Sequence, residues 1–249
     1  MRLNAKANEW AARLTAAMST EDALKISEWL LETIDEVSSN RWDAATQRAA
    51  ALPGDIRPEK IKALTDSFSR ELGVAGAAAG AAAAAPTVGT AGTMLAAAAE
   101  LGWFTTRAGD LILTIAATHG RPAPTVDERR AWVLAVLIYG SSAKDGISRA
   151  INEASTGVAP TVDRRIPLAT LQMANRVMSR SLLRRYGSRR AAIALGRALP
   201  IGIGAFIGGS ANYTAIRTLA RNADQFFARL PYSAIDVDST DVTGRLLGA

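Results

Sequence analysis

An uncharged segment rich in alanine and glycine constrains the fold of this chain more than any other feature. It covers residues 72–99, LGVAGAAAGAAAAAPTVGTAGTMLAAAA, between Glu71 and Glu100. Pro86 and Gly89 divide it into two pieces that are each too short to span a bilayer, and alanine and glycine insert poorly. We therefore expect a helical hairpin whose glycines allow close packing, either inside a helical core or as a re-entrant membrane segment.

The remaining periodicities that can be read are helical, since no long alternation of apolar and polar residues occurs. Capping and breaking residues predict an amphipathic helix over 1–36, a polar connection over 37–56, and helices over 58–72, 101–118, 126–139, 143–154, 167–186 and 188–199. A last helix runs from the uncharged segment that begins at Pro200 to about Leu230. The predicted fold class is therefore all-α, a multi-helix bundle. We expect the central Ala/Gly-rich hairpin to pack against the glycine-rich C-terminal helix, with amphipathic helices around both.

This pattern suggests three parts. N-terminal amphipathic helices occupy residues 1–54, a helical domain occupies 55–230, and a tail of Ser, Thr, Gly and Asp occupies 231–249, where we expect mobility. The start, MRLNAKANEW, lacks the apolar run of a signal peptide, so we expect a cytoplasmic protein.

Positive charge is concentrated in one part of the chain. Eleven arginines and no acidic residue lie between Arg164 and Ala223, although the net charge of the chain is only +6. The same part contains the uncharged stretch ALPIGIGAFIGGSANYTAI. Clustered positive charge beside a small-residue apolar segment indicates an anionic partner, of which a membrane surface or lipid is the first candidate.

Five arginines form what we call the basic face: Arg180, Arg184, Arg185, Arg189 and Arg190. Each could bind a lipid headgroup, with about 1 kcal/mol per residue near a charged surface. Nucleic acid is a less favoured partner, because Tyr186 is the one aromatic interleaved with them and no DNA- or RNA-binding motif is apparent. An ordinary solvated face, partly neutralised by the acidic residues of 20–36 and 127–128, is the alternative that the residues leave open.

Three blocks together resemble the EcsC family of bacterial proteins. The first is the alanine-rich hairpin followed by RAGDL, and the second is DLILTIAATHGRPAPTVDERRAWVLAVL. The third, LPIGIGAFIGGSANYTAIRTLARNAD, is the most specific, and its matching positions are Pro200, Gly208, Gly209, Asn212 and Tyr213. The second block departs from the pattern at His119, where an aromatic residue is expected. The resemblance covers about residues 55–230 and implies a mostly helical, membrane-associated protein without an established active site.

The glycines of the third block favour helix packing over phosphate binding. Gly204 and Gly208 lie one helical turn apart, with Asn212 one turn further along the same face and Tyr213 beside it. No strand precedes them and no Gly-Lys-Ser/Thr follows, so a nucleotide-binding loop is not indicated. We expect these residues to pack against a neighbouring helix, with Asn212 hydrogen-bonded across the interface and Tyr213 as a possible anchor at an interfacial boundary.

No catalytic constellation stands out in the sequence. The chain has no cysteine and one histidine, which argues against a common zinc site, and we expect neither a metal nor a cofactor. His119 is expected at a helix C-terminus, where a cationic ring favours the helix dipole. Arg107 and Asp110 interrupt an apolar region at a spacing of i,i+3, which indicates a partly buried ion pair.

The sequence therefore predicts a non-catalytic, membrane-associated binding protein, peripheral at the inner face of the cell membrane. Its expected partner is an anionic lipid or a membrane protein, and its oligomeric state is undetermined. The alternative is a membrane-surface hydrolase with a cleft around Asp110, Arg107 and Asn212. A third reading is an interaction protein whose basic face meets an acidic protein.

Overall fold

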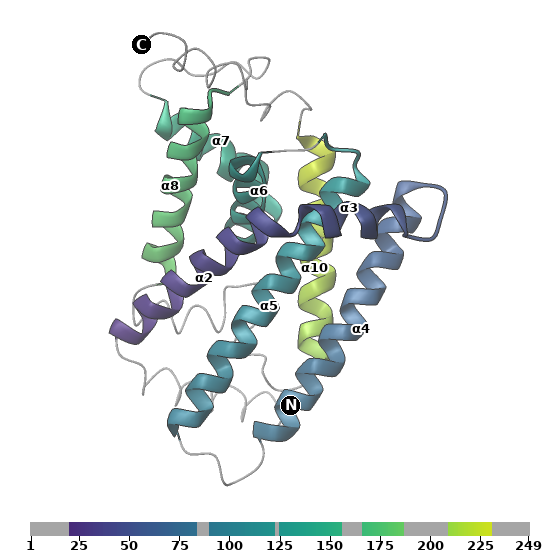
Figure 1. Cartoon of the computed structure of the whole chain (residues 1–249), viewed down its shortest axis with the longest axis vertical. Coiled ribbons are helices and arrows are strands. Elements are labelled where there is room, and N and C mark those ends of the chain that lie inside the picture. Colours follow the sequence, from purple (N-terminus) through teal and green to yellow (C-terminus); the bar gives the residue numbers. More distant parts are fainter. Residues whose placement is uncertain (1–19, 84–89, 123–124, 156–165, 187–208, 231–249) are drawn as a thin grey trace.

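The computed structural model describes residues 20–83, 90–122, 125–155, 166–186 and 209–230 (Figure 1). These residues form helices and their short connections, with no strand among them, so the protein is an all-α multi-helix bundle. The helices are α2 (Thr20–Asn40), α3 (Trp42–Ala50), α4 (Arg57–Ala83), α5 (Thr90–Thr118), α6 (Val126–Tyr139), α7 (Ala143–Ala154), α8 (Leu168–Tyr186) and α10 (Gly209–Arg229), with a 3₁₀ turn, η1 (Gly140–Ser142), before α7.

The polar connection expected over residues 37–56 is wrong in its first half. Helix α2 continues to Asn40, and α3 follows after a single residue. The short apolar stripe of α3 explains this helix, because Trp42, Ala45 and Ala49 recur on one face and are all buried. The ring of Trp42 meets that of Trp132 edge-on, with 6.3 Å between centroids, which fixes α3 to the centre of the bundle.

The uncharged segment forms parts of two long helices. Helix α4 runs without interruption from its charged first half into the alanine-rich stretch as far as Ala83, so the end expected near Leu72 is wrong. Alanine has the highest helix propensity and outnumbers the three glycines of this stretch, and no proline occurs there before Pro86. Helix α5 likewise begins inside the segment, and the two helices lie side by side with opposite directions (Figure 1). The connection between them, residues 84–89, lies outside the described residues.

Helix α10 packs along α4 and also contacts α5 (Figure 1). Its inner face is apolar and fully covered, as shown by Ile216, Leu219, Ala223 and Phe227. Helix α10 thus lies against α4 and α5, and the packing expected between the Ala/Gly-rich hairpin and the glycine-rich segment stays a prediction.

Helix α6 is at the centre of the bundle, with every residue from Ala131 to Ile138 buried. Its predicted ends are confirmed. Thr125 and Glu128 form the capping box, and Gly140, with φ of 55°, ends the helix in a conformation that favours glycine. The predicted bounds of α7 are also confirmed.

Glycine allows α2 to approach α5 closely. A Cβ atom added to Gly102 would overlap the ring of Trp29, and one added to Gly109 would lie 2.5 Å from Cγ1 of Val37. These two positions, seven residues apart on α5, fit the close-packing role that small residues have between helices. The packing places α2 and α3 on the same core as the rest of the described bundle.

Within the described residues, none of the helices has the length and apolar character needed to cross a membrane.

Candidate functional site

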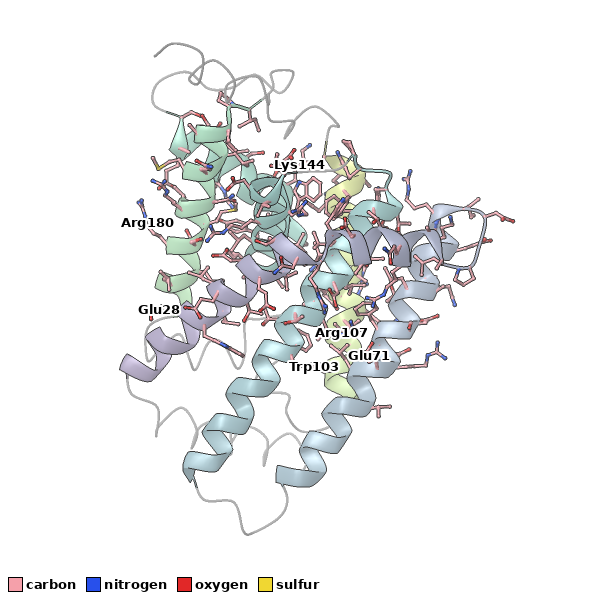
Figure 2. All side chains as sticks on the ribbon, in the orientation of Figure 1. Glu28, Glu71, Trp103, Arg107, Lys144 and Arg180 are labelled. Carbon is pink, nitrogen blue, oxygen red and sulfur yellow. The ribbon has the colours of Figure 1, made fainter. Side chains whose placement is uncertain are left out.

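The basic face begins on the outer side of α8. Leu171, Met178 and Leu182 are buried on the inner side, whereas Arg176 and Arg180 are exposed (Figure 2). Arg184 and Arg185 lie on the last turn of α8, where the structure describes the helix but not these side chains. Arg189 and Arg190 lie outside the described residues. The amphipathic arrangement predicted for this helix is thus confirmed as far as Leu182.

The arginines of α8 differ in their surroundings from the arginines at the helix junctions. At those junctions arginines tie helices together: Arg129 Nε donates to the carbonyl of Ser38 at the end of α2, and Arg121 Nη2 donates at 2.8 Å to the carbonyl of Phe227 near the end of α10. Among the described residues, Arg176 and Arg180 have no carboxylate partner. Their charge is therefore directed to the outside of the bundle.

An acidic face borders the basic one. Helix α2 contacts α8 and carries six acidic residues against one lysine. Glu28, Glu32 and Glu36 repeat at i,i+4 along α2 and are exposed, and we call them the acidic face. Figure 2 shows Glu28 and Arg180 on the same side of the molecule. The described residues contain no ion pair between these two faces. The acidic face therefore acts on the basic face through long-range electrostatic attraction, which salt screens.

The glycine-rich motif is described only from its last glycine. Pro200, Gly204 and Gly208 lie outside the described residues, Gly209 begins α10, and the structure describes the backbone but not the side chain of Asn212.

Tyr213 does not have the packing role predicted for it. The residue is 37% exposed, its hydroxyl accepts a hydrogen bond from Arg217 Nη1, and the Arg217 guanidinium lies 5.1 Å from the centre of its ring. Its contacts are thus with its own helix at the surface.

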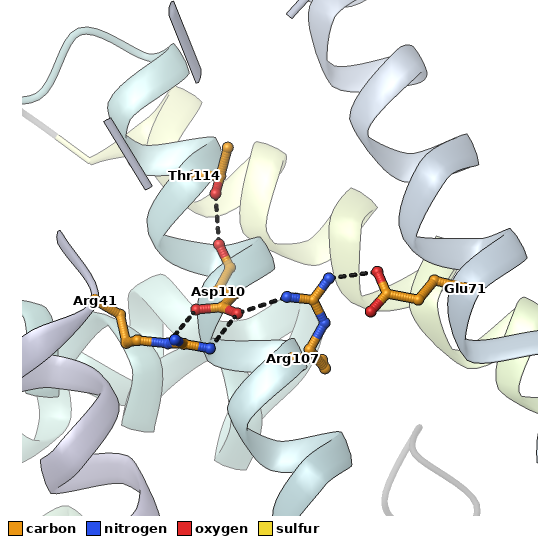
Figure 3. A network of polar contacts seen from close by, with 5 residues as sticks. All are labelled: Arg41, Glu71, Arg107, Asp110 and Thr114. Carbon is orange, nitrogen blue, oxygen red and sulfur yellow. Dashed lines mark hydrogen bonds and ion pairs between the residues drawn. The ribbon is translucent and has the colours of Figure 1, made fainter. Parts of the chain in front are cut away.

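The pair predicted between Arg107 and Asp110 is part of a larger network (Figure 3). Arg107 Nη1 lies 2.8 Å from Asp110 Oδ2, and Arg41 donates from Nε and Nη2 to the two carboxylate oxygens at 3.0 Å each. Arg107 Nη2 donates to Glu71 on α4. The Asp110 residue is 4% exposed, so this network joins the α2–α3 junction, α5 and α4 from an almost completely buried carboxylate.

The geometry of the network favours a structural role over acid–base catalysis. Both oxygens of Asp110 accept hydrogen bonds from arginines, so neither is directed toward a substrate proton. The Arg107 guanidinium also lies 4.6 Å from the centre of the Phe68 ring, which holds it by a cation–π contact. The sequence indicated the Arg107–Asp110 pair but not its partners. The one available signal for Glu71 was its position directly before the uncharged segment.

The single histidine lies where the sequence predicts but has a partner that the sequence did not indicate. It follows the last residue of α5, and its Nε2 lies 2.8 Å from Oδ1 of Asp224 on α10. Burial lowers the pKa of His119, and the hydrogen bond to Asp224 opposes this effect. The pair joins two helices at their C-terminal ends.

No cluster of three His, Cys, Asp or Glu side chains suited to a metal ion occurs in the described part of the chain. Comparison of the chain with protein-family models, curated proteins and solved structures finds no match. The resemblance to the EcsC family therefore stays a prediction from the sequence.

Proposed function

We propose that this protein binds the surface of an anionic membrane through its basic face. The observation that carries the proposal is the contrast between arginines. Those at the helix junctions have tertiary partners, whereas Arg176 and Arg180 point outward from α8 without a carboxylate. The sequence adds four further arginines, at 184, 185, 189 and 190, before any acidic residue occurs. Such a cluster attracts anionic headgroups.

Two further points support a peripheral mode of binding at the inner face of the cell membrane. The described helices include none that could cross a bilayer, and the resemblance to the EcsC family implies membrane association. A membrane protein with an acidic surface is a second possible partner of the same face. Lipid is the partner proposed here, because the outward arginines repeat along one helix side and would meet a planar surface together.

The membrane-surface hydrolase is less well supported. It would require Asp110 and Arg107 to act on a substrate together with Asn212, yet the contacts of Asp110 and Arg107 are with each other, Arg41, Glu71 and Phe68. This network has the arrangement of a buried ion cluster that fixes helices.

Vesicle flotation tests the proposal. The full chain should float with vesicles that contain phosphatidylglycerol and should stay in solution with neutral phosphatidylcholine vesicles. Replacing Arg180, Arg184, Arg185, Arg189 and Arg190 by glutamine should abolish flotation.

A control variant removes five positive charges elsewhere, by replacement of Lys60, Lys62, Lys144, Arg221 and Arg229 with glutamine. It should float nearly as well as the parent, because these residues lie outside the basic face. Equal loss of binding in both variants would mean that net charge alone matters, and unchanged binding of the first variant would contradict the proposal. Flotation that requires a protein-containing membrane extract would favour a protein partner.

A further inference from the structure

Two exposed apolar side chains mark a boundary on the α4–α5 pair. Val74 on α4 is 72% exposed, and Trp103 on α5 is 38% exposed. Figure 2 shows Trp103 next to Arg107 and Glu71, on the side that leads toward the Ala83 end of α4 and the Thr90 end of α5. Exposed aromatic and aliphatic side chains at one level of a helix pair are the kind of feature that marks a surface for a partner.

Charge is distributed unevenly on the two sides of this boundary. On the body side, Arg70 is exposed one turn before Val74, and Arg107 pairs with Glu71. On the other side, α4 continues to Ala83 without a charged residue. Helix α5 begins at Thr90 and has Glu100 as its single charge before Trp103. In Figure 1 these helix ends extend beyond the described ends of α2, α8 and α10.

Helix α10 adds an aromatic residue near its own end. Tyr213, also partly exposed, lies four residues into α10 and stacks with Arg217. An order of charged residues, then Trp and Tyr, then an uncharged helical end is the order found where proteins meet the membrane–water interface. Arg70 supplies exposed positive charge on the body side of this boundary, which matches an anionic headgroup layer, whereas Arg217 pairs with Asp66.

We infer that the ends of α4 and α5 beyond Val74 and Trp103 enter the interfacial region of an anionic bilayer. This inference rests on the proposed membrane binding and adds the part of the protein that inserts. Insertion is shallow for two reasons. Alanine and glycine gain little free energy in hydrocarbon, and the carboxylate of Glu100 favours the headgroup region over the bilayer centre. Trp103 is the anchor, because an indole ring has an apolar body and a polar N–H group.

A site-specific fluorescent probe tests the inference in the full-length chain. The protein has no cysteine, so one introduced cysteine can be labelled uniquely with an environment-sensitive nitrobenzoxadiazole dye. Val74→Cys places the dye at the proposed boundary. Ile56→Cys is the matched control, because Ile56 is also an exposed aliphatic residue, 56% accessible, and lies one residue before the start of α4, about 27 Å from Val74 along the helix. Both labelled proteins are mixed with phosphatidylcholine–phosphatidylglycerol vesicles, and flotation is measured on the same samples.

The emission of the dye at position 74 should shift to the blue when vesicles are added. Lipid with a nitroxide near the headgroup should quench this dye more strongly than lipid with a nitroxide deep in the acyl chain. The dye at position 56 should show neither change. Trp103→Ala should reduce vesicle affinity several-fold while leaving the helical circular dichroism intact. Proteins that float while the dye at position 74 stays in water would overturn the inference and leave the proposed function standing. Proteins that do not float would overturn both.

Discussion

Arg41 and Asp110 are 69 residues apart in the chain, and two hydrogen bonds of 3.0 Å join the guanidinium of one to the carboxylate of the other. The contact fixes the junction between α2 and α3 onto the middle of α5. Because Asp110 also binds Arg107, and Arg107 binds Glu71, one carboxylate connects three regions of the bundle. The pair thus ties the α2–α3 junction to the network that joins α5 and α4.

Replacement of Asp110 by alanine should destabilise the protein strongly. The change removes one of the two carboxylates that pair with Arg107, whose side chain is 14% exposed, and leaves its pair with Glu71. Loss of one partner of a buried ion pair costs about 3–5 kcal/mol, and the partial exposure of Arg41 places the expected value near the lower limit, about 3 kcal/mol. Urea unfolding followed by circular dichroism measures the change.

Asp66→Ala serves as the comparison, because Asp66 pairs with Lys62 and Arg217 at the surface. Its melting temperature should be close to that of the parent, since exposed ion pairs contribute little. Similar melting temperatures for the Asp66 and Asp110 variants would mean that the buried network is not a main source of stability.

Gly109→Ala should destabilise the contact between α5 and α2. The added methyl group would meet Val37, so the helices must separate or the valine must move, with an expected loss of about 1–3 kcal/mol. Val37→Ala removes the obstructing methyl groups. The double variant should therefore be more stable than the sum of the two single changes implies, and a double-mutant cycle measures this coupling. Additive effects would show that the two residues are not in tight contact.

Acidification should lower the free energy of unfolding of the protein through protonation of His119. The pKa of this histidine in the folded protein lies below its ordinary value of 6.5, mainly because of burial. Between the lower folded pKa and 6.5 the unfolded chain therefore binds more protons, and the free energy of unfolding decreases as the pH falls through that window. The stability difference between the parent and His119→Gln, measured from pH 8 to pH 5, should shrink below pH 6.5. A difference that grows on acidification would indicate that protonation strengthens the pair with Asp224.

The features that could be predicted from the sequence are local ones. Thr125 and Glu128 lie three residues apart, so the capping box of α6 can be read directly, and the same is true of Gly140 at its end. Helix α3 was missed because three small or aromatic residues in a polar stretch give a weak periodic signal. The continuation of α4 beyond Leu72 was missed because the sequence changes there from charged to uncharged and alanine-rich. Such a change in composition is also typical of the boundary between two elements.

The contacts of the candidate site were harder to predict, because they join distant parts of the chain. Arg107 and Asp110 are on one turn of α5 and were found, whereas Arg41 and Glu71 reach them from other helices. The partner of His119 is 105 residues away. A single sequence carries no signal for such pairs. The acidic face of α2 also became relevant to the arginines of α8 only when the fold placed the two helices in contact.

The central claim is that outward arginines bring this protein to an anionic membrane, and the salt dependence of vesicle affinity tests it most directly. The dissociation constant of the full chain for phosphatidylglycerol-containing vesicles should rise steeply between low and moderate salt, because mobile ions screen exposed charges. The variant with the five basic-face arginines replaced by glutamine should bind at least tenfold more weakly at low salt, a loss of about 1.4 kcal/mol or more, with little further dependence on salt. An affinity that does not change with salt, or that is equal for the parent and the variant while both remain folded, would contradict the account.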